Sequence, residues 1–271
     1  MFCVKIFLRT KAGEKIMNIA VITGASSGIG KVMAESLHNY FDGIDEIWAI
    51  ARSEDKLKSL ETKIPVRVIK LDLTKDECLK EYSRLLEQEN PNVKILINSA
   101  GYGKFGKPCE ISTEATLGMI DLNCKALVSV TSSSLPYMQK NARILQICSV
   151  ASFIPLPFIN VYGATKSFVQ SYSLALSEEL KPYKISVTTL CPFWTNTEFF
   201  AVAEDVNSNT KAVKNYMGML PPEKVAHVGL KALKNKKAFA IPGFLGKVLL
   251  VLSKVAPKRL AMKVWLLNCN K

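Results

Sequence analysis

The sequence predicts one α/β domain built on a doubly wound, mainly parallel sheet of seven strands with helices on both faces. Three observations carry this prediction: short apolar runs alternate with helical patterns, a glycine-rich turn follows the first run, and no linker or low-complexity segment divides the 271 residues. Repeated strand–helix units favour right-handed crossovers and therefore parallel strands. With 48% hydrophobic residues, a chain of this length can bury one sizeable core.

Seven apolar runs are the expected strands. Most of their residues are apolar or β-branched, which is typical of parallel strands that helices cover on both faces. The runs span residues 19–22, 47–51, 66–69, 95–97, 144–148, 185–190 and 238–241. In an open sheet of this kind ligands bind beyond the carboxyl ends of the strands, so the turns after these runs are the expected location of a site.

A glycine-rich turn, TGASSGIG, occupies residues 23–30 between the first expected strand and a helical pattern. Gly24, Gly28 and Gly30 have the spacing GxxxGxG, which differs from the phosphate loop of nucleotide hydrolases and from the common GxGxxG dinucleotide fingerprint. Glycines allow positive φ and let a pyrophosphate approach backbone amides at a helix N-terminus, where the partial positive charge favours an anion. The alternative is an ordinary tight connection between a strand and a helix.

Tyr162 and Lys166 lie four residues apart in a helical pattern, so their side chains share one face of the helix. A free tyrosine titrates near pH ~10. An ammonium about 5 Å away, at an effective dielectric constant near ~20, favours the phenolate by roughly 3 kcal/mol, or about two pKa units. We therefore expect Lys166 to lower the pKa of Tyr162 towards neutrality, with Ser149, thirteen residues upstream, holding a substrate oxygen. The alternative is a solvated pair on a helix surface.

Together these motifs resemble the short-chain dehydrogenase/reductase family over residues 18–242. They follow the family order along the chain: TGASSGIG at 23–30, LDL at 71–73, NSAG at 98–101, Asn123 in DLNCKAL, Ser149, Tyr162 and Lys166. The resemblance implies a Rossmann-type domain that binds a nicotinamide cofactor and moves a hydride to or from a CH–OH carbon. It also implies a homo-oligomer, because dimers or tetramers are usual in the family.

The resemblance assigns roles to the catalytic candidates Asn123, Ser149, Tyr162 and Lys166. Ser149 and Tyr162 would hold the substrate oxygen, Tyr162 would exchange its proton, and Lys166 would tune Tyr162 and bind the nicotinamide ribose. Asn123 would hold a water that links Lys166 to solvent. The expected cofactor contacts are Gly24, Ser26, Ser27, Gly28, Ile29, Gly30, Lys31, Arg52, Ser53, Asp72, Leu73, Asn98, Ala100, Gly101, Tyr162, Lys166, Pro192, Thr195 and Thr197. From the residues alone, Asn98 and Asn123 are equally well buried amides at helix and strand ends.

Charge at the end of the second expected strand predicts a preference for NADP(H). NAD-selective folds usually place an acid there, which binds the adenosine ribose and would repel a 2′-phosphate. This chain has Ala51 and Arg52 instead, followed by Ser53. Arg52 can bind a phosphate through two N–H groups, and Lys31, just after the glycine turn, would add a second cation. The alternative for Lys31 is a solvated lysine in the first turn of a helix.

The segment after the sixth expected strand departs from the family pattern at one position. The resemblance places the nicotinamide carboxamide near Pro192, Thr195 and Thr197, but the usual Pro-Gly pair is Pro192-Phe193 here. Because phenylalanine does not readily adopt positive φ, we expect a different local backbone or a different nicotinamide contact.

Two aromatic segments, 153–158 and 193–220, are expected to flank the site. Neither contains a cluster of cations for a multiply charged substrate, so the sequence favours a bulky, mostly apolar alcohol or ketone such as a hydroxysteroid or a bile acid. The alternative for these aromatic residues is packing of the loops onto the core. Two other functions remain open: reduction of a 3-oxoacyl thioester, and a non-enzymatic protein that senses NADP(H).

The net charge of +13 is concentrated at the two ends of the chain. Residues 224–271 hold eleven Lys or Arg and no acid, and residues 1–17 have a net charge of +3, which leaves the middle of the chain close to neutral. This distribution does not favour nucleic-acid binding by the core.

The C-terminal tail, residues 244–271, alternates apolar clusters with basic residues and is interrupted by Pro257. Its longest apolar run, 248–252, is far shorter than the ~20 residues needed to span a bilayer. We favour a tail whose apolar side covers a substrate mouth or a partner subunit while its lysines face water. The alternative is peripheral contact with an anionic membrane surface.

Residues 1–17 are interpreted as an extension before the domain, which we place at 18–243. The segment is too charged for a secretory signal, and Met17 directly precedes the first strand, so we expect synthesis to start there. The seven cysteines are odd in number and lack metal-like spacing, which favours a reduced, cytoplasmic protein without a disulfide framework. With two histidines far apart in the sequence, no metal site is expected.

Overall fold

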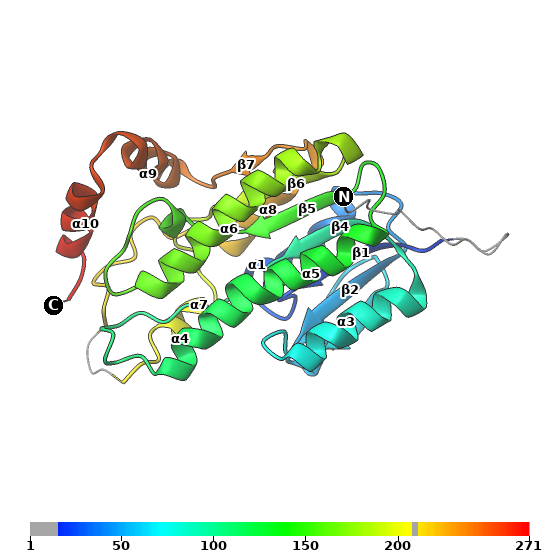
Figure 1. Cartoon of the computed structure of the whole chain (residues 1–271), viewed down its shortest axis with the longest axis horizontal. Coiled ribbons are helices and arrows are strands. Elements are labelled where there is room, and N and C mark those ends of the chain that lie inside the picture. The colour runs from blue at the N-terminus through cyan, green and yellow to red at the C-terminus, as the bar shows by residue number, and fades with distance from the viewer. Residues whose placement is uncertain (1–15, 208–210, 271) are drawn as a thin grey trace.

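The computed structural model describes residues 16–207 and 211–270 of the chain. Within them, seven strands form one sheet in the order β3-β2-β1-β4-β5-β6-β7 (Figure 1), and every neighbouring pair is parallel. The strands are β1 (Asn18–Thr23), β2 (Glu46–Ala51), β3 (Val66–Lys70), β4 (Asn92–Asn98), β5 (Arg143–Ile147), β6 (Ser186–Leu190) and β7 (Phe239–Ala240). All seven expected strands are present, so the predicted doubly wound sheet is confirmed.

Helices cover both faces of the sheet. The α-helices of the described residues are α1 (Gly28–Ser36), α2 (Glu54–Lys58), α3 (Asp76–Glu89), α4 (Thr113–Ile120), α5 (Leu127–Ser134), α6 (Asn160–Glu179), α7 (Phe199–Ala203), α8 (Pro222–Lys234), α9 (Phe244–Val255) and α10 (Lys258–Leu267). Short 3-10 turns occur at Leu37–Asn39, Leu135–Tyr137, Val150–Ser152 and Lys181–Tyr183, and a π-helical turn at Asp121–Ala126. In Figure 1, α3, α5 and α6 lie in front of the strands, and α1 and α8 lie behind them.

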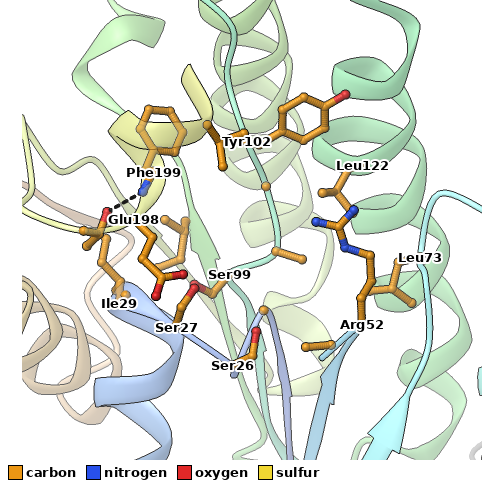
Figure 2. A pocket seen from close by; sticks show the side chains of 18 of the residues that line it. Ser26, Ser27, Ile29, Arg52, Leu73, Ser99, Tyr102, Leu122, Glu198 and Phe199 are labelled. Atoms are coloured by element: carbon orange, nitrogen blue, oxygen red, sulfur yellow. Dashed lines mark hydrogen bonds between the residues drawn. The ribbon is translucent and has the colours of Figure 1, made fainter. Parts of the chain in front are cut away.

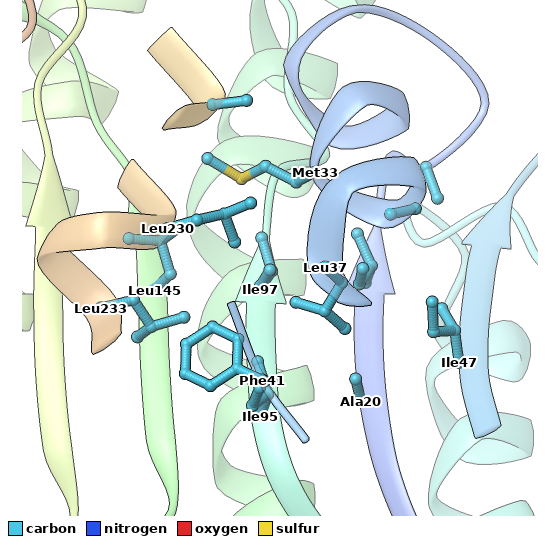
Figure 3. Close-up of a cluster of buried hydrophobic side chains, with 14 of the residues drawn as sticks. Ala20, Met33, Leu37, Phe41, Ile47, Ile95, Ile97, Leu145, Leu230 and Leu233 are labelled. Carbon is cyan, nitrogen blue, oxygen red and sulfur yellow. The ribbon is translucent and has the colours of Figure 1, made fainter. Parts of the chain in front are cut away.

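Two layers of buried side chains hold these helices to the sheet. Because successive residues of a strand point to opposite faces, Val21 of β1 packs with α3 and α5, whereas Ile22 packs with α1 and α8. Figure 3 shows the second layer, in which Met33 and Leu37 meet Leu230 of α8 over the strands. The central strands β1 and β4 are therefore buried on both faces, which explains why their sequences are mostly apolar.

The connection from β6 to β7 departs from the right-handed crossovers that we expected throughout. The connections through α5 and α6 add β5 and β6 on one side of β4, and both helices lie on the same face. β7 adds in the same direction, yet α8 lies on the opposite face with α1, so this crossover is left-handed. The preference for right-handed crossovers comes from short connections that follow the twist of a strand, and the long segment 191–221 relaxes it.

The C-terminal tail forms two helices, α9 and α10, outside the sheet (Figure 1). Trp265 of α10 donates a hydrogen bond from Nε1 to the Pro157 carbonyl at 2.9 Å, and Cys269 forms an antiparallel bridge with Val213. Gly246 of α9 is also buried. These contacts anchor the tail on the segments that follow β5 and β6. No helix in the described part of the chain combines the length and apolarity needed to span a membrane.

At the other end of the chain, residues 1–15 of the expected N-terminal extension lie outside the described residues. Met17 is partly buried against the core, and its carbonyl accepts a hydrogen bond from the Asn92 N–H at 2.9 Å. The hydrogen bonding of the sheet therefore already includes Met17, one residue before β1 begins.

Leu230→Ala should destabilise the domain strongly, because the Leu230 side chain is fully buried between α8, α1 and the sheet. Truncating a buried leucine and leaving a cavity lowers the free energy of unfolding by about 2–5 kcal/mol. The matched control is Leu174→Ala on α6, where the side chain is 42% exposed and the expected loss is below about 1 kcal/mol. Urea denaturation measures both values, and equal losses would contradict this account of the core.

Candidate active site

A cavity of about 1040 Å³ opens at the carboxyl ends of the strands (Figure 2). It lies where the chain turns from β1 towards β2 on one side and from β4 towards β5 on the other, which leaves a crevice between the two turns. Most predicted residues line this cavity: Gly24, Ser26, Ser27, Gly28, Ile29, Arg52, Ser53, Asp72, Leu73, Ala100, Gly101, Ser149, Tyr162, Lys166, Pro192, Thr195 and Thr197. Four predicted residues do not line it: Gly30, Lys31, Asn98 and Asn123.

The glycine-rich turn forms a tight cradle at one side of the cavity. Gly24 and Gly28 have φ of +67° and +54°, a region that favours glycine. A Cβ at Gly24 would come within 2.7 Å of the Ala100 nitrogen, and a Cβ at Gly30 would overlap the Gly24 carbonyl oxygen. The Ser27 side chain does not cap α1, so amides of the first turn are free to bind an anion. The cradle fits a pyrophosphate group.

Thr23 ties together the ends of the two central strands. Its Oγ1 accepts hydrogen bonds from the backbone N–H groups of Ser99 at 3.1 Å and Ala100 at 3.2 Å. The Gly24 N–H donates to the Ile50 carbonyl at 2.8 Å, which joins the end of β2 to the same junction. Three strand ends are thereby held in a fixed relation at the floor of the cavity.

Arg52 and Asp72 lie where β2 and β3 end. Figure 2 shows the Arg52 side chain rising from the end of β2 into the cavity. The Asp72 carboxylate accepts hydrogen bonds from the Thr74 N–H at 3.1 Å and from the Thr74 hydroxyl at 2.7 Å. Burial raises the pKa of Asp72, but the Thr74 hydrogen bonds and the Arg52 charge together outweigh burial, so this pKa lies below its ordinary value. Asp72 is thus an ionised carboxylate that Thr74 holds in a fixed direction.

Lys31 does not reach the cavity, contrary to its predicted role beside Arg52. Its Nζ lies 3.7 Å from Glu35 Oε1, one turn further along the outer face of α1. The Lys31 side chain therefore lies on the solvent side of α1, as the alternative interpretation of a solvated lysine in the first turn expects. The residues at the end of β2 that do line the cavity are Arg52 and Ser53.

Ser149, Tyr162 and Lys166 meet at the other end of the cavity, and all three are buried. Lys166 Nζ donates a hydrogen bond to the Ile147 carbonyl at 2.9 Å and lies 5.7 Å from the centre of the Tyr162 ring. Ser149 Oγ accepts a hydrogen bond from the Ala151 N–H at 3.1 Å, which fixes the start of the turn after β5. The interpretation of Tyr162 and Lys166 as a solvated surface pair is therefore wrong.

The pKa of Tyr162 is raised, whereas the spacing of the sequence led us to expect a lowered value. Burial is the largest cause, and the hydrogen-bonding contact with the Ser149 hydroxyl offsets it only in part. Burial also lowers the pKa of Lys166, because it disfavours the charged ammonium. The expectation considered only the attraction between two charges and left out the desolvation of both groups.

Asn123 uses its whole side-chain amide in hydrogen bonds from the π-helical turn. Oδ1 accepts from the Tyr102 N–H at 3.0 Å, and Nδ2 donates to the Tyr102 carbonyl at 2.9 Å and to Thr165 Oγ1 at 3.0 Å. Asn98 Nδ2 donates to Thr131 Oγ1 at 2.9 Å. Both asparagines are therefore buried amides that join neighbouring elements, which was the alternative interpretation from the residues alone.

Phe193 in the turn after β6 does not adopt positive φ. Phenylalanine therefore causes no backbone strain at the position where the family usually has glycine. Thr195 Oγ1 donates to the Phe193 carbonyl at 2.9 Å, and Thr197 Oγ1 donates to the Thr195 carbonyl at 3.4 Å. Thr197 also approaches the glycine cradle, since a Cβ at Gly28 would lie 3.2 Å from its Cγ2. The turn after β6 therefore closes over the turn after β1.

One of the two expected substrate segments reaches the cavity. This is the segment after β6, from which Trp194 lines the cavity. Tyr216 of the same segment packs against Trp194, with the two ring centres 5.1 Å apart. The segment 153–158 does not line the cavity, and Phe153 packs instead against Phe239 at 6.2 Å between ring centres. The segment after β6 contributes four aromatic residues to the wall: Phe193, Trp194, Phe199 and Phe200.

Sequence reasoning missed an ion pair at the cavity. Lys56 Nζ lies 2.8 Å from Glu198 Oε2, and both residues line the cavity, one from α2 and the other from the segment after β6. They are 142 positions apart, and no local pattern connects them. Tyr102 was also missed, although it directly follows the NSAG motif; its hydroxyl donates to the Ala115 carbonyl at 2.9 Å.

Comparison with known proteins places these features in one family. The family model described as short chain dehydrogenase matches residues 18–207. An uncharacterised oxidoreductase of Staphylococcus aureus is 30% identical over 224 residues, which cover 81% of this chain and 92% of the relative. A structure of a short-chain dehydrogenase from Sphingobium yanoikuyae in complex with NADPH is 25% identical, with a TM-score of 0.70 over 90% of this chain and 97% of that chain.

A second solved structure, a serine dehydrogenase complexed with NADP+, is 30% identical, with a TM-score of 0.63 over 77% of this chain and 86% of that chain. The glycine cradle and the crevice beside it fit the nicotinamide dinucleotide that such folds bind. The chain belongs to the short-chain dehydrogenase family and is an oxidoreductase that uses a nicotinamide cofactor.

Proposed function

We propose that the protein is an NADP(H)-dependent oxidoreductase that interconverts a secondary alcohol and a ketone on a bulky, largely hydrophobic substrate such as a hydroxysteroid or a bile acid. The observation that supports this most is the meeting of two features at one end of the cavity. The hydroxyls of Ser149 and Tyr162 stand beside a wall of aromatic rings, and the Phe199 ring lies 5.4 Å from that of Tyr162. A polar pair next to an apolar wall suits one oxygen on a mostly apolar molecule.

The proton chemistry starts from a neutral phenol. Because burial raises the pKa of Tyr162, its hydroxyl keeps its proton at neutral pH, which is the form that reduction needs. Ser149 and Tyr162 would donate hydrogen bonds to the carbonyl oxygen, and Tyr162 would pass its proton to that oxygen as the carbonyl carbon gains a hydride. When bound, the nicotinamide ring supplies this hydride in reduction and accepts it in oxidation. Reduction therefore leaves an alcohol and a Tyr162 phenolate.

Lys166 would stabilise and reload this phenolate. One of its three N–H groups donates to the Ile147 carbonyl, and the ammonium lies 5.7 Å from the centre of the Tyr162 ring. A negative charge on Tyr162 favours the charged form of Lys166, and the ammonium favours the phenolate in return. Asn123 would act as a positioning residue for Lys166, because its side-chain amide donates a hydrogen bond to Thr165, the residue before Lys166 in α6.

The proposed preference for NADP(H) rests on charge at the end of β2. Arg52 and Ser53 line the cavity where an NAD-selective fold usually presents an acid. The ionised Asp72 carboxylate, which also lines the cavity, is directed at Thr74 by two hydrogen bonds. The two solved relatives described above bind NADPH and NADP+, whereas other solved neighbours of the fold bind NAD and NADH, so the charge of Arg52 carries the proposed preference.

At the opposite end of the cofactor site, we assign the nicotinamide contacts to the turn after β6. Pro192, Thr195 and Thr197 line the cavity there, and Phe199 of the same segment lies 5.4 Å from the Tyr162 ring. Their backbone and hydroxyl groups offer both donors and acceptors for a carboxamide.

A substrate panel separates this function from its two competitors. A 3-oxoacyl thioester reductase would reduce acyl thioesters faster than steroid ketones, and an NADP(H) sensor would bind the cofactor without turnover. Nicotinamide absorbance with NADPH and NADH, measured over ketones, alcohols and acyl thioesters, distinguishes the three. A clear preference for thioesters would overturn the proposed substrate and leave the reaction class intact.

In the protein without cofactor, Tyr162 should ionise only above pH ~10. A raised pKa means that the phenol stays protonated as pH rises through the ordinary tyrosine range, and the phenolate appears later. The difference in ultraviolet phenolate absorbance between wild type and Tyr162→Phe should therefore stay flat up to that pH. A phenolate signal between pH ~7 and ~9 would show that Lys166 already lowers the pKa of Tyr162 without a ligand.

Tyr162→Phe should lower kcat about 10²–10⁴-fold on the best substrate of the panel, because it removes the proton donor and keeps the ring. The matched control is Tyr172→Phe on the same helix, at a tyrosine that packs on the core and does not line the cavity. Turnover is measured at saturating cofactor, and cofactor affinity is measured separately by fluorescence. Near-wild-type turnover of Tyr162→Phe would exclude this residue as the donor.

Arg52→Asp should shift the cofactor preference towards NAD(H). Replacing a cation with a carboxylate at the 2′-phosphate position should lower the ratio of kcat/KM with NADPH to that with NADH by at least about tenfold. Arg84→Asp on α3 is the control, because Arg84 is exposed, pairs with Glu81 and lies outside the cavity. An unchanged ratio in Arg52→Asp would refute the assigned role of Arg52.

A further inference from the structure

The tail helices expose an apolar and basic surface that the proposed reaction does not use. Its apolar side chains are between 52% and 78% exposed, which is unusual for six large residues on two adjacent helices. We call this surface the tail face. Its apolar members are Phe244, Val251 and Val255 of α9, and Leu260, Val264 and Leu267 of α10.

The inner side of the same helices is already occupied. Trp265 reaches inward, where its ring lies 6.3 Å from that of Trp194 and its Nε1 donates to the Pro157 carbonyl. Leu250 of α9 packs on the cluster beneath β7, and Gly246 is buried. Packing on the rest of the molecule therefore accounts for one side of each helix and leaves the tail face without a partner among the described residues.

The spacing of the exposed residues makes the tail face continuous along each helix. Phe244, Val251 and Val255 recur after seven and four positions, so they form one stripe on α9. Leu260, Val264 and Leu267 recur after four and three positions and form a second stripe on α10. Each of the two tail helices therefore presents one apolar stripe to solvent.

The charges around the stripes have one sign. Residues 244–271 contain six Lys or Arg and no acid. No ion pair found among the described residues engages the five basic side chains of the tail helices and the turn between them, which are Lys247, Lys254, Lys258, Arg259 and Lys263. The partner of the tail face must therefore supply both anions and an apolar interior.

We propose that α9 and α10 dock the protein on the surface of an anionic lipid bilayer. Helices of 12 and 10 residues are about 18 and 15 Å long, too short for a hydrocarbon core of about 30 Å, so they would lie in the plane of the surface. The apolar stripes would enter the boundary between headgroups and acyl chains, and the basic residues would meet lipid phosphates. A second copy of the chain fits less well, because two tail faces would bring cations against cations.

Vesicle flotation tests this proposal on the full chain. The wild-type protein should float with vesicles of phosphatidylcholine and phosphatidylglycerol and stay behind with vesicles of phosphatidylcholine alone. Binding should weaken as salt is raised, because ions screen the attraction between lysines and headgroups. If the wild-type protein does not float with the anionic vesicles at low salt, the proposal is overturned.

Two variants separate the apolar and the basic parts of the tail face. Val255→Gln combined with Val264→Gln and Leu267→Gln should weaken vesicle binding by at least about tenfold, because three inserted side chains are lost. Lys254→Gln combined with Lys258→Gln and Lys263→Gln should also weaken it by at least about tenfold, since each cation near the surface contributes separately. Both variants should keep wild-type turnover and circular dichroism, because these side chains face solvent.

Matched controls remove the same groups elsewhere. Lys231→Gln with Lys234→Gln and Lys237→Gln takes the same charge from the end of α8 and the turn after it, and Phe168→Gln with Leu174→Gln removes exposed apolar groups from α6. Both controls should bind vesicles like wild type. If the charge control loses as much binding as the tail variant, the attraction belongs to net charge and not to this face. Sedimentation that shows wild-type dimers dissociated by the tail variants, without vesicle binding, would assign the face to a second copy.

Discussion

The junction between β1 and β4 is the contact on which the rest of the site depends. Thr23 accepts two amides from the end of β4, and Gly24 turns away in a space too small for a Cβ. Both strands are buried on both faces, so their ends cannot separate without breaking the parallel hydrogen bonds of the sheet. The crevice is therefore a property of the backbone, and the side chains around it decide only what it binds and how the bound molecule reacts.

Burial disfavours the charged forms of Tyr162 and Lys166. Tyr162 and Lys166 are both desolvated, so the neutral phenol is favoured and the ammonium is disfavoured in the protein by itself. When Tyr162 gives up its proton during turnover, the Lys166 ammonium stabilises the phenolate at short range, in a medium of low dielectric constant. The same burial that keeps Tyr162 a proton donor at rest makes the pair strongly coupled once the proton has left.

Much of this arrangement followed from local sequence, and the exceptions have physical reasons. Buried parallel strands appear as continuous apolar runs, and tight turns need glycine, so the strands and the cradle were predicted. The direction of Lys31 on α1 depends on helix rotation, which places it beside Glu35. The pair of Lys56 and Glu198, the left-handed crossover before β7 and the packing of 153–158 all depend on contacts between distant segments, which no local pattern encodes.

The tail connects the surface of the molecule to the substrate end of its cavity. Trp194 lines the cavity on one side and contacts Trp265 of α10 on the other. The outer stripe of α10 lies one helix diameter away, about 10 Å from that contact. A bilayer bound at the tail face would therefore lie close to the aromatic wall of the cavity. An apolar substrate dissolved in lipid would then have a shorter path through water to Ser149 and Tyr162 than one that must diffuse from bulk solution, which suits the hydrophobic substrate proposed for this site.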